Sequence, residues 1–268
     1  MHRTPRRRRR FARPLALLIL ASAGCAASPV EWTPSRAATS RGDAFVLDAD
    51  GGLRPDTMAV LASRLVPPGP VCAGSLRIAA AGHTLFGVWW APRSDSSAWL
   101  AAAHSTDGGR TWVGRAPVDT TDASNAGCHR APAAIAADSM SGYVHVTYAL
   151  QAKEGPGLFF SHSMDGGNTF HEPVPILYGE RMGRTSVATD GDLVVVGFED
   201  PNSATPRIGL ALSRTMGHIF EHRILPVSDD NGIAAHPMTA VRGRRIAVAW
   251  ESSASDPTAL VVRTGTVR

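Results

Sequence analysis

The sequence predicts an all-β protein, built as a β-propeller of four-stranded antiparallel blades, and two observations support this fold class. The first is a repeated phrase, Ser-x-Asp-Gly-Gly-x-Thr-aromatic, which occurs at residues 105–112 and again at 163–170, with an eroded copy at 213–220. The copies begin 58 residues (105 to 163) and 50 residues (163 to 213) apart. A period near 50 residues is typical of one propeller blade per repeat.

The second observation is that runs of β-branched and aromatic residues, bounded by Gly and Asp, recur at a similar spacing. They have the composition of buried strands and lie at 85–90, 143–148, 193–198 and 245–250. Four blades are therefore visible, and the segment before Val71 is a candidate for part of a fifth. The last repeat ends before its fourth strand, and an open edge would expose unpaired backbone groups. We expect Ala44–Leu47 to close the ring.

Each repeated phrase has the composition of a tight turn between the third and fourth strands of a blade. Asp-Gly-Gly supplies residues that adopt positive φ, and the Asp carboxylate can accept hydrogen bonds from the N–H groups of the turn. The Ser and Thr hydroxyls can bond across the turn, and the aromatic residue packs between blades. The residues expected to hold the two intact turns are Ser105, Asp107, Gly109, Thr111, Trp112, Ser163, Asp165, Gly167, Thr169 and Phe170.

This phrase resembles the Asp box of the sialidase-like (BNR repeat) β-propellers, and the resemblance covers about Val71 to Arg268. In that family the box is a structural turn away from the active site, so the resemblance implies the fold and says little about the chemistry. Sialidases have six blades and use a Tyr nucleophile, a Glu that activates it, an Asp acid/base and three substrate-binding arginines. The first of these arginines usually stands in an Arg-Ile-Pro phrase. The nearest text here, Arg77-Ile78-Ala79, lacks the proline.

Residues 1–25 have the pattern of an export signal, with a basic stretch, a short apolar core and small residues that lead to Cys25. Arg8-Arg9-Arg10-Phe11 resembles the twin-arginine pattern of bacterial export signals. Ser22-Ala23-Gly24-Cys25 resembles a lipobox, which implies a lipid on Cys25, whereas Ala21-Ser22-Ala23 also fits an ordinary cleavage site. We expect an exported protein, either a cell-envelope lipoprotein or a secreted chain, with the twin-arginine route as one option. An N-terminal segment at 26–70 and the propeller at 71–268 follow the signal.

Removing the signal reverses the charge of the chain. The whole sequence has 27 Lys and Arg against 23 Asp and Glu, but seven of the arginines, and no acid, lie in residues 1–25. The remaining 20 basic and 23 acidic residues give a net charge of −3. This balance argues against a nucleic-acid partner, and it leaves membrane contact only through a lipid anchor at Cys25.

No metal or cofactor is expected, because no CxxC or HExxH phrase occurs in the sequence. Beyond Cys25, the chain has only Cys72 and Cys128. In an oxidising compartment these two favour a disulfide, with a pair of buried thiols as the alternative.

The candidate binding face comes from laying the repeats over one another. Aligning Gly191 with Gly243 places Arg184 on His236 and Glu199 on Glu251, in loops that share one mouth of the central channel. The same mouth receives the crossing into the second repeat, and the full candidate set is His129, Arg130, Arg184, Glu199, His236 and Glu251. Such residues suit an anionic sugar or acid–base chemistry. The alternative is that they pair with one another or with the backbone.

Two functions follow from these patterns. The first is an exported, sialidase-like propeller that binds a glycan or a cell-surface protein. The second is an exo-α-sialidase-like glycoside hydrolase. The resemblance fits both, because a fold does not fix a function.

Overall fold

The computed structural model of the chain describes residues 28–37, 70–229, 232–253 and 258–268. These residues form strands, turns and bends and contain no helix, so the described part of the chain has no helical membrane span. The predicted all-β fold class is confirmed.

Three blades come from consecutive strands of the chain, and each is a four-stranded antiparallel sheet. Blade 1 contains β3 (Arg77–Ala81), β4 (Thr84–Pro92), β5 (Ala98–Ser105) and β6 (Val113–Gly114). Blade 2 contains β7 (Ala134–Ala137), β8 (Val144–Ala152), β9 (Gly155–Ser163) and β10 (Val174–Tyr178). Blade 3 contains β11 (Thr185–Asp190), β12 (Leu193–Glu199), β13 (Ile208–Ser213) and β14 (His222–Pro226).

Blade 4 takes its outer strands from the N-terminal part of the chain. Its first three strands are β15 (Ala234–Arg242), β16 (Arg245–Ser252) and β17 (Ala259–Val267). The short strands β1 (Val30–Trp32) and β2 (Arg36–Ala37) both pair antiparallel with β17. The segment expected to close the ring, Ala44–Leu47, lies outside the described residues, as does the rest of 38–69.

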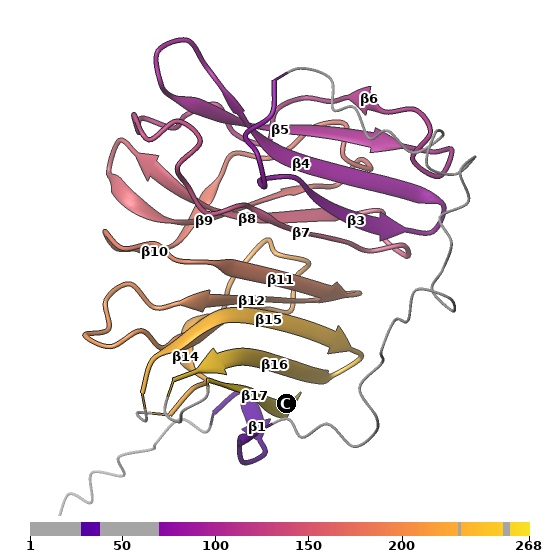
Figure 1. The fold of residues 1–268 in the computed structure, drawn as a ribbon. Coiled ribbons are helices and arrows are strands. Elements are labelled where there is room, and N and C mark those ends of the chain that lie inside the picture. The colour runs from indigo at the N-terminus through magenta and orange to yellow at the C-terminus, as the bar shows by residue number, and fades with distance from the viewer. Residues whose placement is uncertain (1–27, 38–69, 230–231, 254–257) are drawn as a thin grey trace, which may run out of the picture.

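The blades stack in chain order, and blades 1 and 4 lie at opposite ends of the stack (Figure 1). Successive blades meet through their inner strands, with β3 against β7, β7 against β11 and β11 against β15. Alternate side chains of the second strands enter the hydrophobic layers between blades. Val146 and Tyr148 face blade 1, whereas Val248 and Trp250 face blade 3. Because both faces of an internal blade are covered, β12 of blade 3 is a nearly continuous apolar run.

The repeated phrases form the expected turns between third and fourth strands. In the second copy, the Asp165 carboxylate accepts the backbone N–H of Thr169 at 2.9 Å and the hydroxyls of Thr169 and Ser163, each at 2.7 Å. Asp107 accepts the equivalent bonds in the first copy. The eroded third copy keeps the turn, because the Thr215 hydroxyl replaces the carboxylate and accepts the N–H of Ile219 at 2.9 Å.

A second repeated contact links neighbouring blades. Asp138, which follows β7, accepts the N–H of Gly191 in blade 3 at 2.7 Å. Asp190, at the end of β11, accepts the N–H of Gly243 in blade 4 at 2.6 Å. Both glycines have positive φ, +58° and +54°. Blades 2 and 3 therefore each hold the first turn of the blade that follows.

Candidate functional site

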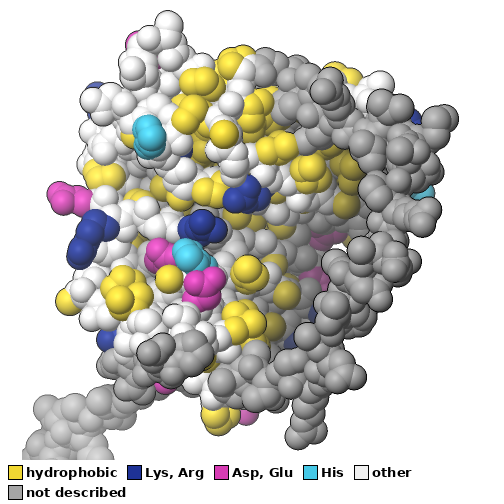
Figure 2. Space-filling view, in the orientation of Figure 1, with side chains coloured by type: hydrophobic (Ala, Val, Ile, Leu, Met, Phe, Trp, Pro, Cys, Tyr) yellow, Lys and Arg dark blue, Asp and Glu magenta, His cyan; other side chains and the backbone are white. Residues whose placement is uncertain are grey.

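All four blades meet at a cavity of about 270 Å³ on their inner strands. Blade 1 contributes Arg77, and β7 with the residue before it contributes Ala133 and Ala134. Blade 3 contributes Arg184 and Ser186, and blade 4 contributes the run His236–Met238. Basic, acidic and histidine side chains lie next to one another near the middle of the face that Figure 2 shows.

His236 is the most constrained residue of this central cavity. Its φ is +55°, an uncommon conformation for a residue other than glycine, and β15 changes register between Ala235 and Met238. Its backbone N–H donates to Oε1 of Glu199 at 2.8 Å, and its Nδ1 lies 2.9 Å from Oε2 of Glu251. Two carboxylates thus fix the backbone and the ring of one histidine, whose side chain stays 40% exposed.

The two arginines of the cavity differ in how they are held. Arg77 donates from Nη1 to the backbone carbonyls of Gly74 at 2.9 Å and Leu76 at 2.7 Å. The exposed side chain of Arg184 makes no hydrogen bond or ion pair with any described residue. Arg184 is therefore the cation most available to an anionic ligand.

Arg130 and His129 lie away from the central cavity. The Arg130 guanidinium is 2.8 Å from the Asp122 carboxylate, and the two side chains are 8% and 1% exposed. It also lies over the ring of Trp90, 4.6 Å from the centroid. These contacts give Arg130 a structural environment between blades 1 and 2. His129 and Arg130 both line a second cavity of about 220 Å³, together with Gln151.

The structure therefore brings four of the six predicted residues together, namely Arg184, Glu199, His236 and Glu251. Sequence reasoning missed Arg77 as a lining residue, although it had noted the Arg-Ile phrase that contains it. The available signal was the position of Arg77 in a first strand: aligning Gly82 with Gly191 places it on Ser186, which also lines the cavity.

Cys72 and Cys128 form the expected disulfide, with their Cα atoms 5.1 Å apart. Cys72 precedes β3 and is 1% exposed, and Cys128 lies in the crossing that leads to β7. The bond fastens the beginning of blade 1 to this crossing. Cys25 lies outside the described residues.

None of the chain's three tyrosines, all within the described ranges, lines the central cavity. Tyr148 is buried and donates to Oδ2 of Asp119 at 2.7 Å; burial, with Asp119, raises its pKa well above the usual value. Tyr178 is on the outer strand β10, and Tyr143 stacks on His162 near the blade 2–blade 3 junction. A tyrosine nucleophile is thus missing from the cavity. No group of three or more described His, Cys, Asp or Glu side chains could hold a metal ion.

Comparisons with known proteins place the fold but not the activity. No protein-family model matches the chain, and no curated protein matches its sequence. Among solved structures, the Hadza microbial sialidase Hz136 is similar over 70% of this chain and 43% of that chain, with a TM-score of 0.51 and 17% identity. The Trypanosoma rangeli sialidase in complex with the inhibitor DANA is similar over 68% of this chain and 29% of that chain, with a TM-score of 0.48 and 11% identity. The chain thus spans less than half the length of these sialidases, and its β-propeller fold is similar to that of Hz136.

Proposed function

We propose that the chain binds an anionic glycan at the central cavity without hydrolysing it. The observation that carries the proposal is the pairing of an unengaged cation, Arg184, with a histidine held by two glutamates, His236. Arg184 can bind a sugar carboxylate through its guanidinium fork. His236 and the glutamates can bind the sugar hydroxyls by donating and accepting hydrogen bonds.

The position of the tyrosines favours binding over sialidase chemistry. A sialidase needs a tyrosine nucleophile next to an activating glutamate. Tyr143, Tyr148 and Tyr178 have other neighbours, so the cavity offers carboxylates and a histidine but no such nucleophile. The alternative, a glycoside hydrolase, would instead have to use Glu199 or Glu251 around His236.

The proposal includes export and a surface partner. The signal-like residues 1–25 would deliver the propeller outside the cytoplasm, and a lipid on Cys25 would hold it at a membrane. The bound glycan would then belong to the cell surface or to a surface protein. No cofactor is part of this function.

The test is calorimetric titration of residues 26–268 with N-acetylneuraminic acid, glucuronic acid and neutral galactose. We expect an acidic sugar to bind more tightly than galactose, and Arg184→Gln to weaken that binding about 10- to 100-fold, the effect of losing a charge-assisted hydrogen bond. Arg110→Gln removes an exposed arginine from a turn of blade 1 and serves as the matched control. Equal affinities of the Arg184→Gln variant and the unaltered chain would exclude this site.

The same proteins test the alternative with a fluorogenic sialoside. Release of the fluorophore that Glu251→Gln abolishes would establish a hydrolase and overturn the non-catalytic proposal. No release, together with binding that depends on Arg184, supports the binding protein.

A further inference from the structure

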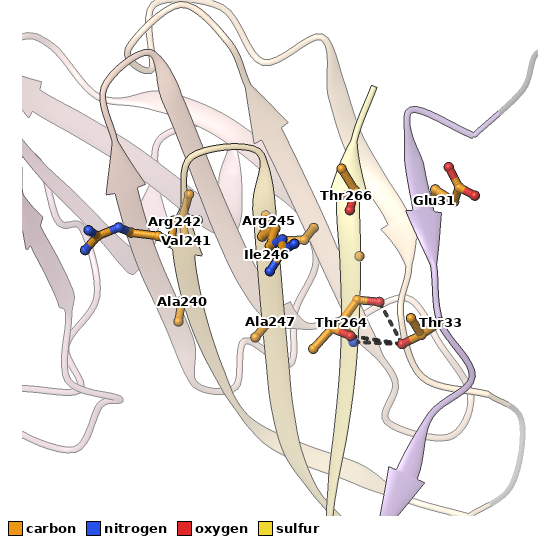
Figure 3. A pocket seen from close by; sticks show the side chains of 11 residues that line it. Glu31, Thr33, Ala240, Val241, Arg242, Arg245, Ile246, Ala247, Thr264 and Thr266 are labelled. Carbon is orange, nitrogen blue, oxygen red and sulfur yellow. Dashed lines mark hydrogen bonds between the residues drawn. The ribbon is translucent and has the colours of Figure 1, made fainter.

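The face of blade 4 that points away from blade 3 differs from the other blade faces. Along β16, Ile246, Val248 and Trp250 pack in the hydrophobic layer against blade 3. Arg245 and Ala247 alternate with them and therefore point to the opposite face, which Figure 3 shows.

Equivalent positions in blade 3 show which side chains a face carries when the next blade packs on it. Leu193 and Val195 of β12 pack against blade 4. Arg245 and Ala247 stand at the same two positions of β16, counted from Gly191 and Gly243. A further blade packed on this face would bury Arg245. A polar outer face is typical of the terminal unit in a stack of repeats.

The blade-to-blade hydrogen bond is also missing at this end. Asp190 accepts the N–H of Gly243 from the following blade, but Arg242 occupies the position equivalent to Asp190. An arginine side chain cannot accept a hydrogen bond. Arg242 therefore cannot hold a following turn as Asp190 does, and this face, with Arg242 and Arg245 on it, is suited to water or a polar ligand.

Strand pairing arranges this face as two rows across the sheet. The first row is Arg242, Arg245, Thr266 and Glu31. In the second row, Ala240, Ala247 and Thr264 are neighbours, and Thr33 follows through a 3.0 Å bond between the two threonine hydroxyls. Because the second row is small, the face is hollowed by a cavity of about 480 Å³ (Figure 3).

One side of this hollow carries two positive charges, Arg242 and Arg245, without a negative partner among the described residues. Arg242 and Arg245 are exposed and directly opposite each other, and neither makes a hydrogen bond or ion pair with a described residue. In Figure 3, Arg245 stands beside the hollow and Arg242 extends past the edge of β15. Like charges at opposed positions repel, so an anion between them would be stabilising. Glu31, at the far side, lies 3.8 Å from Arg268.

We propose that this hollow binds the oxyanion, phosphate or carboxylate, of a small ligand. Arg245 and Arg242 would hold the anion through their guanidinium N–H groups, and the Thr266 hydroxyl would add a further donor. The uncharged part of the ligand would lie over Ala240 and Ala247. None of these residues lines the central cavity, so the site is independent of the proposed glycan site.

The test is calorimetric titration of residues 26–268, at low ionic strength, with inorganic phosphate, glycerol 3-phosphate and acetate. We expect binding of phosphate or acetate, weakened at least 10-fold in the double variant Arg242→Gln/Arg245→Gln. The Arg110→Gln control should bind as the unaltered chain does, and the Arg184→Gln variant should keep its binding of phosphate. The anion that binds more tightly identifies the ligand group as phosphate or carboxylate.

A measurement of stability keeps this test interpretable. Because the two arginines repel each other, the double variant should have a melting midpoint at least as high as that of the unaltered chain without ligand. A lower midpoint would show that the arginines stabilise the sheet, and it would overturn the proposal. Failure of every anion to bind the unaltered chain, undiminished binding by the double variant, or loss of binding in Arg184→Gln alone would overturn it equally.

Discussion

Acidification should destabilise this protein, because two histidines are buried in their neutral form at the junction of blades 2 and 3. His145 and His162 are 0% and 5% exposed, and none of their four ring nitrogens has a hydrogen-bond partner. Burial, reinforced by His162 and His218 and opposed by Asp138, lowers the pKa of His145 to about 3. Burial, with His218 and His171, lowers the pKa of His162 to about 4.

The sign of the effect follows from proton uptake. In the unfolded chain both histidines have a pKa near 6.5, so below pH 6.5 the unfolded state takes up protons that the folded state does not. As the pH is lowered below 6.5, the free energy of unfolding therefore decreases. The decrease continues until the pH reaches the folded-state pKa values of the two histidines, about 4 and 3. At pH 5, about 1.5 pH units below 6.5, each histidine lowers it by about 2 kcal/mol, and the pair by about 4 kcal/mol. This is a large part of the roughly 5–15 kcal/mol that stabilises a typical domain.

Urea unfolding of residues 26–268 at pH 8, 6.5 and 5, followed by tryptophan fluorescence, measures the change. The double variant His145→Leu/His162→Leu should lose most of the pH dependence, whereas the exposed His83→Leu control should keep it. The turn carboxylate of Asp165 does not contribute between pH 8 and 5. Burial acts to raise the pKa of Asp165, but hydrogen bonds from Thr169 and Ser163 lower it to about 2. A loss below about 1 kcal/mol in the unaltered chain, or the same loss in the double leucine variant, would refute this reasoning.

Two further predictions concern the turn carboxylate of blade 2 and the disulfide between blades 1 and 2. Asp165→Ala should lower the free energy of unfolding by about 1–3 kcal/mol, towards the lower end because the carboxylate is exposed, and should leave ligand binding unchanged. Urea unfolding with a parallel ligand titration checks this, and lost binding at unchanged stability would contradict a structural role. Cys72→Ser/Cys128→Ser should cost about 4 kcal/mol, the chain-entropy value for a link across 56 positions. Denatured, unreduced residues 26–268 should show no free thiol, and two reactive thiols would exclude the bond.

The repeated turns were predictable because their chemistry is local. Ser163, Asp165 and Thr169 lie within one turn, and their hydrogen bonds need no distant partner. The third copy survives the loss of its aspartate for the same reason, since the Thr215 hydroxyl accepts the bond to Ile219. Strand runs and their period could be read from the sequence because internal blades are apolar on both faces.

The outer strands of blade 4 could not be placed from the sequence. β1 has three residues and β2 has two, too few for the alternation that identifies a strand. Their position depends on pairing with β17, more than 200 residues away. Ala44–Leu47 has the stronger local pattern, and that pattern alone does not select the partner of a distant edge.

The sequence predicted where the candidate site lies, but not which of its charged side chains pair with one another. The lengths of the crossings between blades explain why the pairing was not predictable. Aligned repeats place Arg130 and Arg184 in corresponding crossings, yet their environments differ. The crossing before β7 is long, residues 115–133, and it folds back to bring the buried carboxylate of Asp122 to Arg130. The crossing before β11 is short, residues 179–184, and no described carboxylate pairs with Arg184. A buried cation with its own carboxylate supports the fold, whereas an exposed cation without one is available to a ligand. The length of the crossing therefore separates a structural arginine from a candidate binding residue at corresponding positions of the repeat.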